Sequence, residues 1–176
     1  MDNMKHLGEE LLLFHCASGN EHLMLFKLDI AEAYCLLPVH PFWKIKQVNT
    51  IDGLCSIDRC NVFGGRASFS IWLSFNGLVT WIARYVKDIP RLLFYSDDNF
   101  SIVKASSLVE YEPFKKFMPA DQVALVNLWM ELNIPFKEKK QIFGSPLTII
   151  GIEVDPNAMT FTLPEGAHLD LITERE

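Results

Sequence analysis

The feature that most constrains the fold is a pair of aspartates, Asp97 and Asp98, set between two apolar runs. Leu92–Tyr95 precedes the pair and Phe100–Val103 follows it. This pattern predicts a β-hairpin with two carboxylates at its tip. Adjacent aspartates in a turn can accept hydrogen bonds from backbone N–H groups, which is the simpler interpretation. No glycine relieves this turn, and two like charges repel unless a cation neutralises them, so the hairpin also predicts a divalent-metal site.

Composition indicates one globular domain and limits its partners. The chain has 176 residues, of which 49% are hydrophobic, including 13 Phe and 4 Trp, and this is enough for the core of one domain. The formal net charge is -6. That charge argues against an autonomous nucleic-acid-binding protein, because such proteins usually present a basic face. It is compatible with a carboxylate-rich fragment of a larger basic protein.

The cysteines and the absence of targeting patterns indicate the compartment. Cys16, Cys35, Cys55 and Cys60 are scattered, and the chain does not open with a signal-peptide pattern. We therefore expect reduced thiols and a cytoplasmic or nuclear protein that is not secreted. Cys55 and Cys60 lack a nearby histidine, so the evidence that they form a zinc site is weak. No apolar run approaches the ~20 residues of a membrane span, so we expect no membrane partner.

A third aspartate, Asp29, lies where a strand is expected to end. Residues 22–28 form an apolar run that predicts a buried strand, whereas residues 31–36 favour a helix. Asp29 is therefore either the N-cap of that helix or a ligand carboxylate at a strand end.

The remaining segments complete an α+β pattern. Helices are expected at 7–16, 68–85 and 119–132 and from Pro164, strands at 43–48, 54–59, 148–154 and 159–163, and a polar loop at 104–119. In helix 68–85, both Trp72 and Trp81 are expected in the core. This order predicts a small antiparallel sheet with helices packed on one face. In such a sheet Asp29 and the Asp97/Asp98 tip lie on neighbouring strand ends, where three carboxylates can hold two divalent cations.

Five segments in order resemble the palm of the reverse transcriptases, the RNA-directed DNA polymerases. Lys27–Tyr34 with Pro38–Pro41 resembles motif A, and Phe63–Ser68 resembles motif B. Tyr95–Asp98 resembles the Tyr-x-Asp-Asp box of motif C. Lys139 and Lys140 resemble motif D, and Ile149–Val154 resembles the motif E primer grip. The order and spacing of all five make the resemblance specific. Two departures are Phe69, where motif B often has proline, and Ser96 in the box. Downstream segments look most like retrotransposon polymerases of the DIRS or a related fungal kind.

The resemblance implies a metal-dependent catalytic site. Asp29, Asp97 and Asp98 would be ligands of Mg²⁺ (or Mn²⁺), with the backbone carbonyl of Ile30 assisting. Lys140, or its neighbour Lys139, would act as general acid toward the leaving pyrophosphate.

The resemblance also implies a substrate side. Tyr34 would be a steric gate that excludes a 2′-hydroxyl, although its simpler interpretation is a core aromatic. Phe63, Gly64 and Arg66 would line the nucleotide and template, and Gly151 would allow close approach of the primer backbone.

The resemblance divides the chain into three parts and implies partners. Residues 1–20 are poorly specified, 21–163 form a palm-like domain with motifs A to E, and 164–176 start a truncated thumb helix. Because the chain begins just before motif A, we expect a palm fragment without fingers. Its implied partners are an RNA or DNA template–primer, deoxynucleoside triphosphates, and other polymerase or RNase H segments. We expect exposed apolar surface where fingers and thumb would dock, and therefore self-association.

The residues leave alternative functions open. The first is an RNA-directed DNA polymerase palm that carries out two-metal nucleotidyl transfer. The second is a catalytically inactive, degenerate or co-opted transposon remnant that only folds or binds partners, which the negative charge favours. A two-metal cyclase with a related palm is a third, opposed by Tyr34 and the motif E segment.

Overall fold

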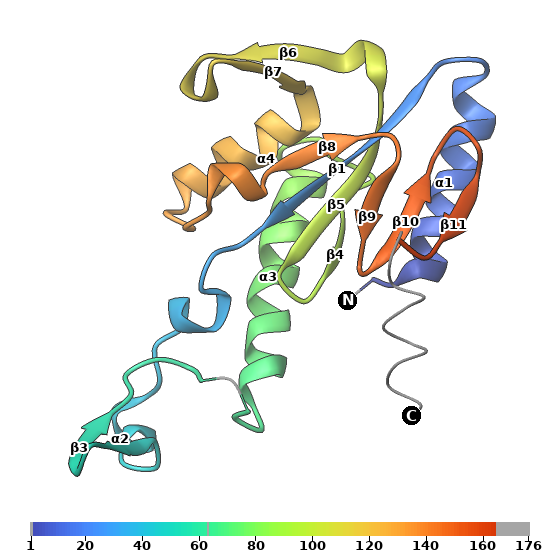
Figure 1. The fold of residues 1–176 in the computed structure, drawn as a ribbon. Coiled ribbons are helices and arrows are strands. Elements are labelled where there is room, and N and C mark those ends of the chain that lie inside the picture. The colour runs from blue at the N-terminus through green and yellow to red at the C-terminus, as the bar shows by residue number, and fades with distance from the viewer. Residues whose placement is uncertain (1, 63, 165–176) are drawn as a thin grey trace, which may run out of the picture.

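A computed structural model describes residues 2–62 and 64–164 (Figure 1). The α-helices are α1 (Met4–Ser18), α2 (Pro41–Lys44), α3 (Ser68–Tyr85) and α4 (Ala120–Glu131). The strands are β1 (Leu23–Asp29), β2 (Val48–Ile51), β3 (Leu54–Ile57), β4 (Leu93–Tyr95), β5 (Asp98–Lys104), β6 (Leu108–Tyr111), β7 (Lys116–Pro119), β8 (Ile142–Gly144), β9 (Leu147–Ile149), β10 (Ile152–Asp155) and β11 (Thr160–Thr162). Short 3₁₀ helices cover Ala33–Leu36, Ala105–Ser107, Glu112–Phe114 and Glu138–Lys140.

The central sheet is antiparallel and has the strand order β4-β5-β1-β8. Strand β1 pairs along its whole length with β5, from Leu23 opposite Lys104 to Asp29 opposite Asp98. Side chains alternate between the two faces of a strand. Leu23 and Leu25 therefore point to one face, and Met24, Phe26 and Leu28 point to the other.

Each face of β1 packs into its own core. Phe26 and Leu28 pack with residues of α3 and α4, including Trp72 and Trp129. Leu23 and Leu25 pack with α1 and with the second sheet, β11-β10-β9; Figure 1 shows α1 beside these strands. The expected α+β fold is confirmed, with α3 and α4 on one face of the small antiparallel sheet. Helix α1 and the second sheet add a cover over part of the other face.

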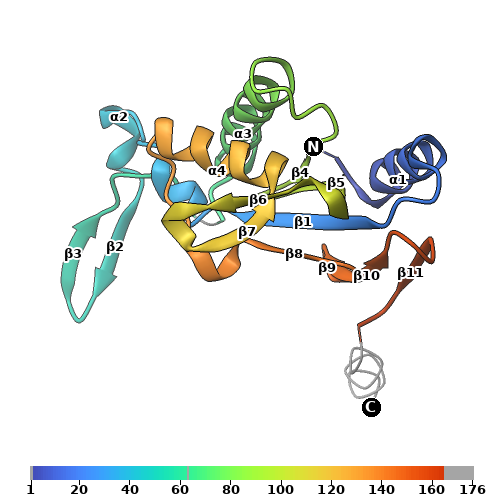
Figure 2. The same ribbon diagram turned by 90° about the horizontal axis from the view of Figure 1, so that it is seen from above.

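One segment differs from the expectation between residues 38 and 60. The strand expected at 43–48 is wrong, because α2 occupies Pro41–Lys44; proline suits a first helical position and the His40 side chain accepts a hydrogen bond from the Phe42 N–H. The Asp52-Gly53 turn joins β2 and β3. Figures 1 and 2 show that α2, β2 and β3 form an arm that projects from the body.

Three further expectations were wrong for identifiable reasons. Residues 104–119 are not simply a loop, because β6 pairs with β7 in a hairpin. The strand expected at 148–154 is split into β9 and β10 by a turn in which Ile150 and Gly151 have φ of 50° and 76°. Trp81 is 54% exposed, because α3 buries its opposite side. The helix expected from Pro164 lies outside the described residues.

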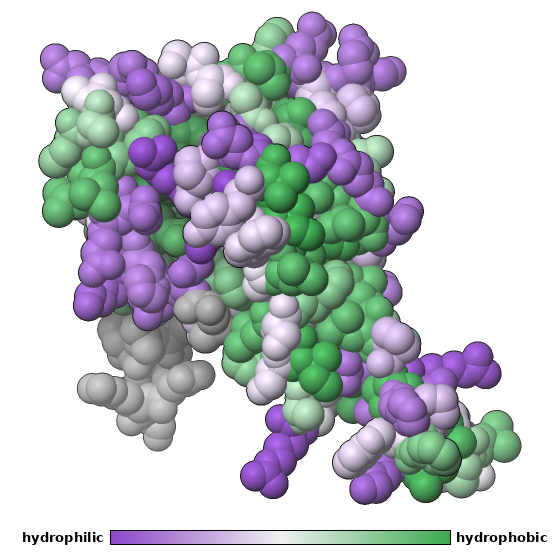
Figure 3. All heavy atoms as spheres, turned by 180° about the vertical axis from the view of Figure 1, so that it is seen from behind, coloured by the Kyte–Doolittle hydropathy of each residue, from purple (hydrophilic) through white to green (hydrophobic). Residues whose placement is uncertain are grey.

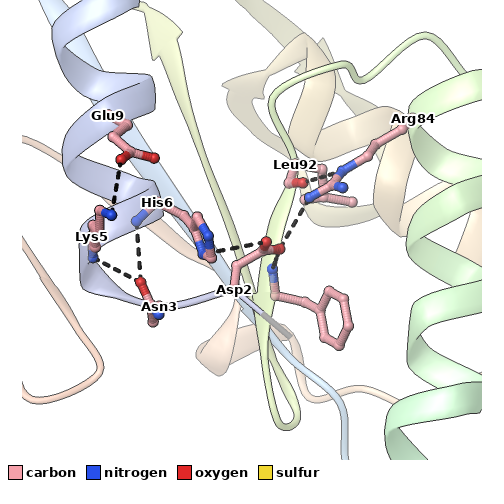
Figure 4. Close-up of polar contacts among 8 residues, drawn as sticks. Asp2, Asn3, Lys5, His6, Glu9, Arg84 and Leu92 are labelled. Atoms are coloured by element: carbon pink, nitrogen blue, oxygen red, sulfur yellow. Dashed lines mark hydrogen bonds and ion pairs between the residues drawn. The ribbon is translucent and has the colours of Figure 1, made fainter.

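The N-terminal segment is tied to the elements that carry the acidic hairpin (Figure 4). The Asp2 N–H donates to the carbonyl of Phe94 at 2.8 Å, and the Phe94 N–H donates to Asp2 Oδ2 at 3.1 Å. Arg84 of α3 donates to the same carboxylate oxygen at 3.0 Å and to the carbonyl of Leu92. Asp2 thereby extends the edge of β4 and links it to α3.

All four cysteines are free thiols. Across the described part of the chain, none of the helices combines the length and the hydropathy needed to cross a bilayer.

Candidate functional site

The acidic hairpin has the predicted form. Strands β4 and β5 are joined by the two-residue loop Ser96-Asp97, with Tyr95 opposite Asp98. Ser96 has φ of 54°, in the left-handed region. Because a non-glycine residue there is strained by about 1 kcal/mol or more, the surrounding structure must hold this loop in place.

Helix α3 supplies that support. The Trp72 indole N–H donates to the Ser96 carbonyl at 2.9 Å, and the Asn76 side-chain amide donates to the same oxygen at 2.8 Å. Both side chains are fully buried and lie one turn apart on α3. The hairpin tip is therefore fixed by two hydrogen bonds from a rigid helix.

The three aspartates come together at one end of the central sheet. Asp29 lies directly opposite Asp98 in the β1–β5 pairing, and the Ile30 N–H donates to the Asp97 carbonyl at 3.3 Å. Asp29 is not a helix cap, since the 3₁₀ helix that follows begins after Glu32. The structure thus rules out the helix-cap interpretation and places Asp29 at a strand end, and its role as a ligand stays a prediction.

Strand alternation determines the face on which the carboxylates lie. Lys27 and Asp29 follow Leu25 on the same face of β1, the face that α1 and the second sheet cover around Leu25. Lys27, Asp29 and Asp98 keep about a fifth of their side-chain surface exposed. The same sheet face is thus apolar under its cover and charged beyond it.

Two lysines neutralise the carboxylates. Lys27 Nζ lies 2.9 Å from Asp98 Oδ2, and Lys140 Nζ donates to both Asp29 oxygens at 3.0 Å. Lys140 comes from the 3₁₀ helix Glu138–Lys140, so the structure brings it to the aspartates as the resemblance implies. Lys139 is exposed and has no ion pair or side-chain hydrogen bond to any described residue.

The pKa values of Asp98 and Lys140 are both raised, for different reasons. Burial raises the pKa of the Asp98 carboxyl, the Lys27 contact opposes this, and the negative charges of Asp97 and Asp29 add to it. The hydrogen bond and the charge of Asp29 raise the pKa of Lys140. Lys140 is therefore protonated at neutral pH.

The raised pKa of Asp98 predicts a pH-dependent stability. An acid that holds its proton more tightly in the folded than in the unfolded chain loses stability as pH rises from its ordinary value of 3.8 through the folded pKa. We expect Asp98→Asn to flatten the fall in the free energy of unfolding above about pH 4, measured by urea unfolding at several pH values. The control is Asp52→Asn in the exposed β2–β3 turn, which should keep the wild-type profile. An unchanged profile in Asp98→Asn would contradict the assignment.

The donor set suits a hard divalent cation. In residues 2–62 and 64–164, no three Asp, Glu, His or Cys side chains already surround a common position for an ion. The available donors are carboxylate oxygens from Asp29, Asp97 and Asp98, which Mg²⁺ and Mn²⁺ prefer. A cation would take over the charge neutralisation that Lys27 and Lys140 provide, and their long flexible side chains can move away.

The residues expected on the substrate side are distributed. Tyr34 is buried, with its ring centre 6.1 Å from that of Trp72, as a core aromatic would be. Gly64, with φ of 83°, and Arg66 are exposed just before α3, and Gly151 is exposed in the β9–β10 turn. No hydrogen bond or ion pair between described residues links these three to the aspartates. Phe63 lies outside the described residues.

The supporting contacts of four residues were not predicted from the sequence. The Lys27 contact had a signal, since a residue two before Asp29 on a strand shares its face. The Trp72 and Asn76 contacts depend on how α3 packs. Gln141 is buried and donates to the carbonyls of Asp29 and Lys137; its position depends on a 3₁₀ turn far along the chain and left no signal.

Comparisons with known proteins bear on the fold. No protein-family model and no curated protein matches the sequence. A solved structure of the foamy viral protease-reverse transcriptase with an RNA/DNA hybrid matches 81% of this chain with a TM-score of 0.61 at 15% identity. The same viral protein with dsDNA matches 81% with a TM-score of 0.58 at 14% identity. The chain spans 17% and 26% of those chains. At this identity the similarity establishes the fold alone: the chain has a reverse-transcriptase-like fold.

Proposed function

We propose that residues 21–163 are the palm of a retrotransposon-type RNA-directed DNA polymerase that acts in the cytoplasm or nucleus. The observation that carries the proposal is the pairing of Asp29 with Asp98 on neighbouring strands, with Asp97 beside them at the hairpin tip. The fold similarity supports it, because the two solved structures of the viral protein hold an RNA/DNA hybrid and dsDNA. The partners of this chain would be a template–primer and deoxynucleoside triphosphates.

The proposed reaction joins the 3′-hydroxyl oxygen of a primer to the α-phosphorus of a deoxynucleoside triphosphate. The bond between that phosphorus and pyrophosphate breaks, and the hydroxyl proton passes to water. Asp29, Asp97 and Asp98 would hold Mg²⁺ or Mn²⁺. Two such ions stabilise charge on attacking and leaving oxygens in phosphoryl transfer. Lys140 Nζ donates a hydrogen bond to Asp29 and is protonated at neutral pH. It would give its proton to the leaving pyrophosphate.

The substrate-side assignments form the finer part of the proposal. Tyr34 would contact the incoming sugar, and Phe63, Gly64 and Arg66 the nucleotide and template. Gly151, in a turn with open space around its Cα, would admit the primer backbone.

Metal binding by a hairpin-tip variant tests the proposal. We expect the wild-type chain to bind Mn²⁺ and Asp97→Asn to bind it at least about tenfold more weakly, because one anionic ligand is lost. Electron paramagnetic resonance of free Mn²⁺ measures both affinities. The matched control is Asp52→Asn, an exposed aspartate in the β2–β3 turn, which should bind as the wild type does. Equal binding by wild type and Asp97→Asn would contradict the proposal.

A second candidate function is a non-catalytic binding module. The observation that favours it is the contact of Lys27 with Asp98 and of Lys140 with Asp29, since these pairs already neutralise two of the three carboxylates without a metal. This candidate predicts neither Mn²⁺ binding nor primer extension. Extension of a primer on an RNA template by the isolated chain would exclude it.

A further inference from the structure

Helix α3 is apolar on both sides, although only one side is covered. Its 18 residues contain a single charged side chain, Arg84. The inner side, which includes Trp72, Val79 and Ala83, is buried against the sheet. A helix that is hydrophobic all round normally lies inside a protein. The outer side of α3 therefore has the character of a surface that another element covers.

The outer side carries a regular repeat. Ile71, Ser74, Leu78, Trp81 and Tyr85 are spaced alternately three and four residues apart and are all exposed; we name these five residues the outer seam of α3. This spacing is the heptad repeat by which helices pair through interlocking side chains. On the molecular face viewed from behind, where α3 lies, Figure 3 shows many hydrophobic residues with paler residues between them.

We infer that the outer seam binds the outer seam of a second copy of this chain, with the two α3 helices antiparallel about a two-fold axis at Leu78. In this register Leu78 meets Leu78 of the second copy, and the small Ser74 meets the large Trp81. Ile71 meets Tyr85. A parallel pair would set Trp81 against Trp81 and Ser74 against Ser74, which crowds one layer and leaves a void in the next. Side-chain size along the seam therefore matches an antiparallel second copy.

The surface area that the outer seam can bury, and its lack of charge, both agree with a second copy of the chain as its partner. Trp81 and Tyr85, whose rings lie 5.6 Å apart, are 54% and 71% exposed, and Leu78 is 57% exposed. Side chains of this size and exposure would bury on the order of 1,000 Å² over both copies, which is near the lower limit for a specific dimer. The seam contains no charge that pairing would desolvate. Arg84 lies off the seam and is held by Asp2 and Leu92.

The oligomeric state of the 176-residue chain tests the inference. Sedimentation equilibrium from about 1 to 100 μM should detect a reversible dimer, and Leu78→Lys should weaken it at least about 100-fold by placing two like charges at the axis. The matched control is Leu12→Lys on α1, since Leu12 is also a helical leucine and is also 57% exposed. A wild-type monomer at 100 μM, or equal weakening by Leu78→Lys and Leu12→Lys, would overturn the inference.

A charge pair tests the orientation. In the antiparallel register, Ile71→Lys combined with Tyr85→Glu places opposite charges together at both ends of the seam, so we expect a dimer within about tenfold of wild type. Ile71→Lys combined with Tyr85→Lys places like charges there and should weaken the dimer at least about 100-fold. Equal loss in both double variants would overturn the antiparallel register. Seam-dependent binding to phosphatidylcholine vesicles by a monomer would identify a membrane as the occupant and also overturn the inference.

The dimer and the proposed function can be tested independently of each other. Asp29, Asp97 and Asp98 lie on β1 and on the β4–β5 hairpin, away from the five seam residues. Leu78→Lys should therefore keep wild-type Mn²⁺ affinity while losing the dimer, and Asp97→Asn should show the reverse.

Discussion

Replacing Trp72 by alanine is expected to lower the free energy of unfolding by about 3–5 kcal/mol, a large part of the roughly 5–15 kcal/mol available to a domain. Trp72 is fully buried, and its ring lies 6.1 Å from that of Tyr34 and 5.6 Å from that of Phe75. Alanine would leave a cavity between α3 and the sheet. It would also remove one of the two hydrogen bonds that hold the Ser96 carbonyl at the hairpin tip.

Two further variants, measured by urea unfolding, test the causes of this loss. Trp72→Phe retains most of the ring volume and loses the N–H donor, so it should cost about 1–2 kcal/mol. The matched control is Trp81→Ala on the outer side of the same helix, which should cost less than about 1 kcal/mol at concentrations where the chain is monomeric. If Trp81→Ala were as costly as Trp72→Ala, the assignment of the buried side of α3 would be wrong.

Local sequence signals predicted much of the fold and of the acidic site. The acidic hairpin follows from two apolar runs around a polar turn, and the expected helix 68–85 matches the bounds of α3. The placement of Asp29 at the end of β1 follows from an apolar run that stops there. In these cases the side chains that define the element also form its core, so their pattern is visible in the chain.

Features that depend on distant packing left little signal. In the hairpin of β6 and β7, buried and exposed residues do not alternate along either strand, so the sequence carries no alternating apolar pattern. Periodicity could not show which side of α3 is inner, because both sides are apolar, and Trp81 was assigned to the core for that reason. The contacts of Lys27 and Gln141 arise only when β1, β5 and the 3₁₀ helix Glu138–Lys140 come together.

Replacing Lys140 by methionine is expected to slow nucleotidyl transfer by about 10²–10⁴-fold under the proposed function, because the leaving pyrophosphate would lose its proton donor. Lys140 is suited to this role by its position beside Asp29, and a lysine is protonated at neutral pH with or without that contact. Single-turnover extension of a labelled primer with Mn²⁺ measures the rate.

Lys139→Met is the matched control. Lys139 belongs to the same 3₁₀ helix, and its side chain has no ion pair or hydrogen bond with any described residue. The rate of this variant should stay within about twofold of wild type. Mn²⁺ affinity separates proton donation from support of the metal site. Removing the Lys140 cation from Asp29 takes away a competitor for that carboxylate, so Lys140→Met should bind Mn²⁺ at least as tightly as wild type while turning over slowly. A variant that is slow because it binds Mn²⁺ weakly would show instead that Lys140 positions Asp29 and does not act as the general acid.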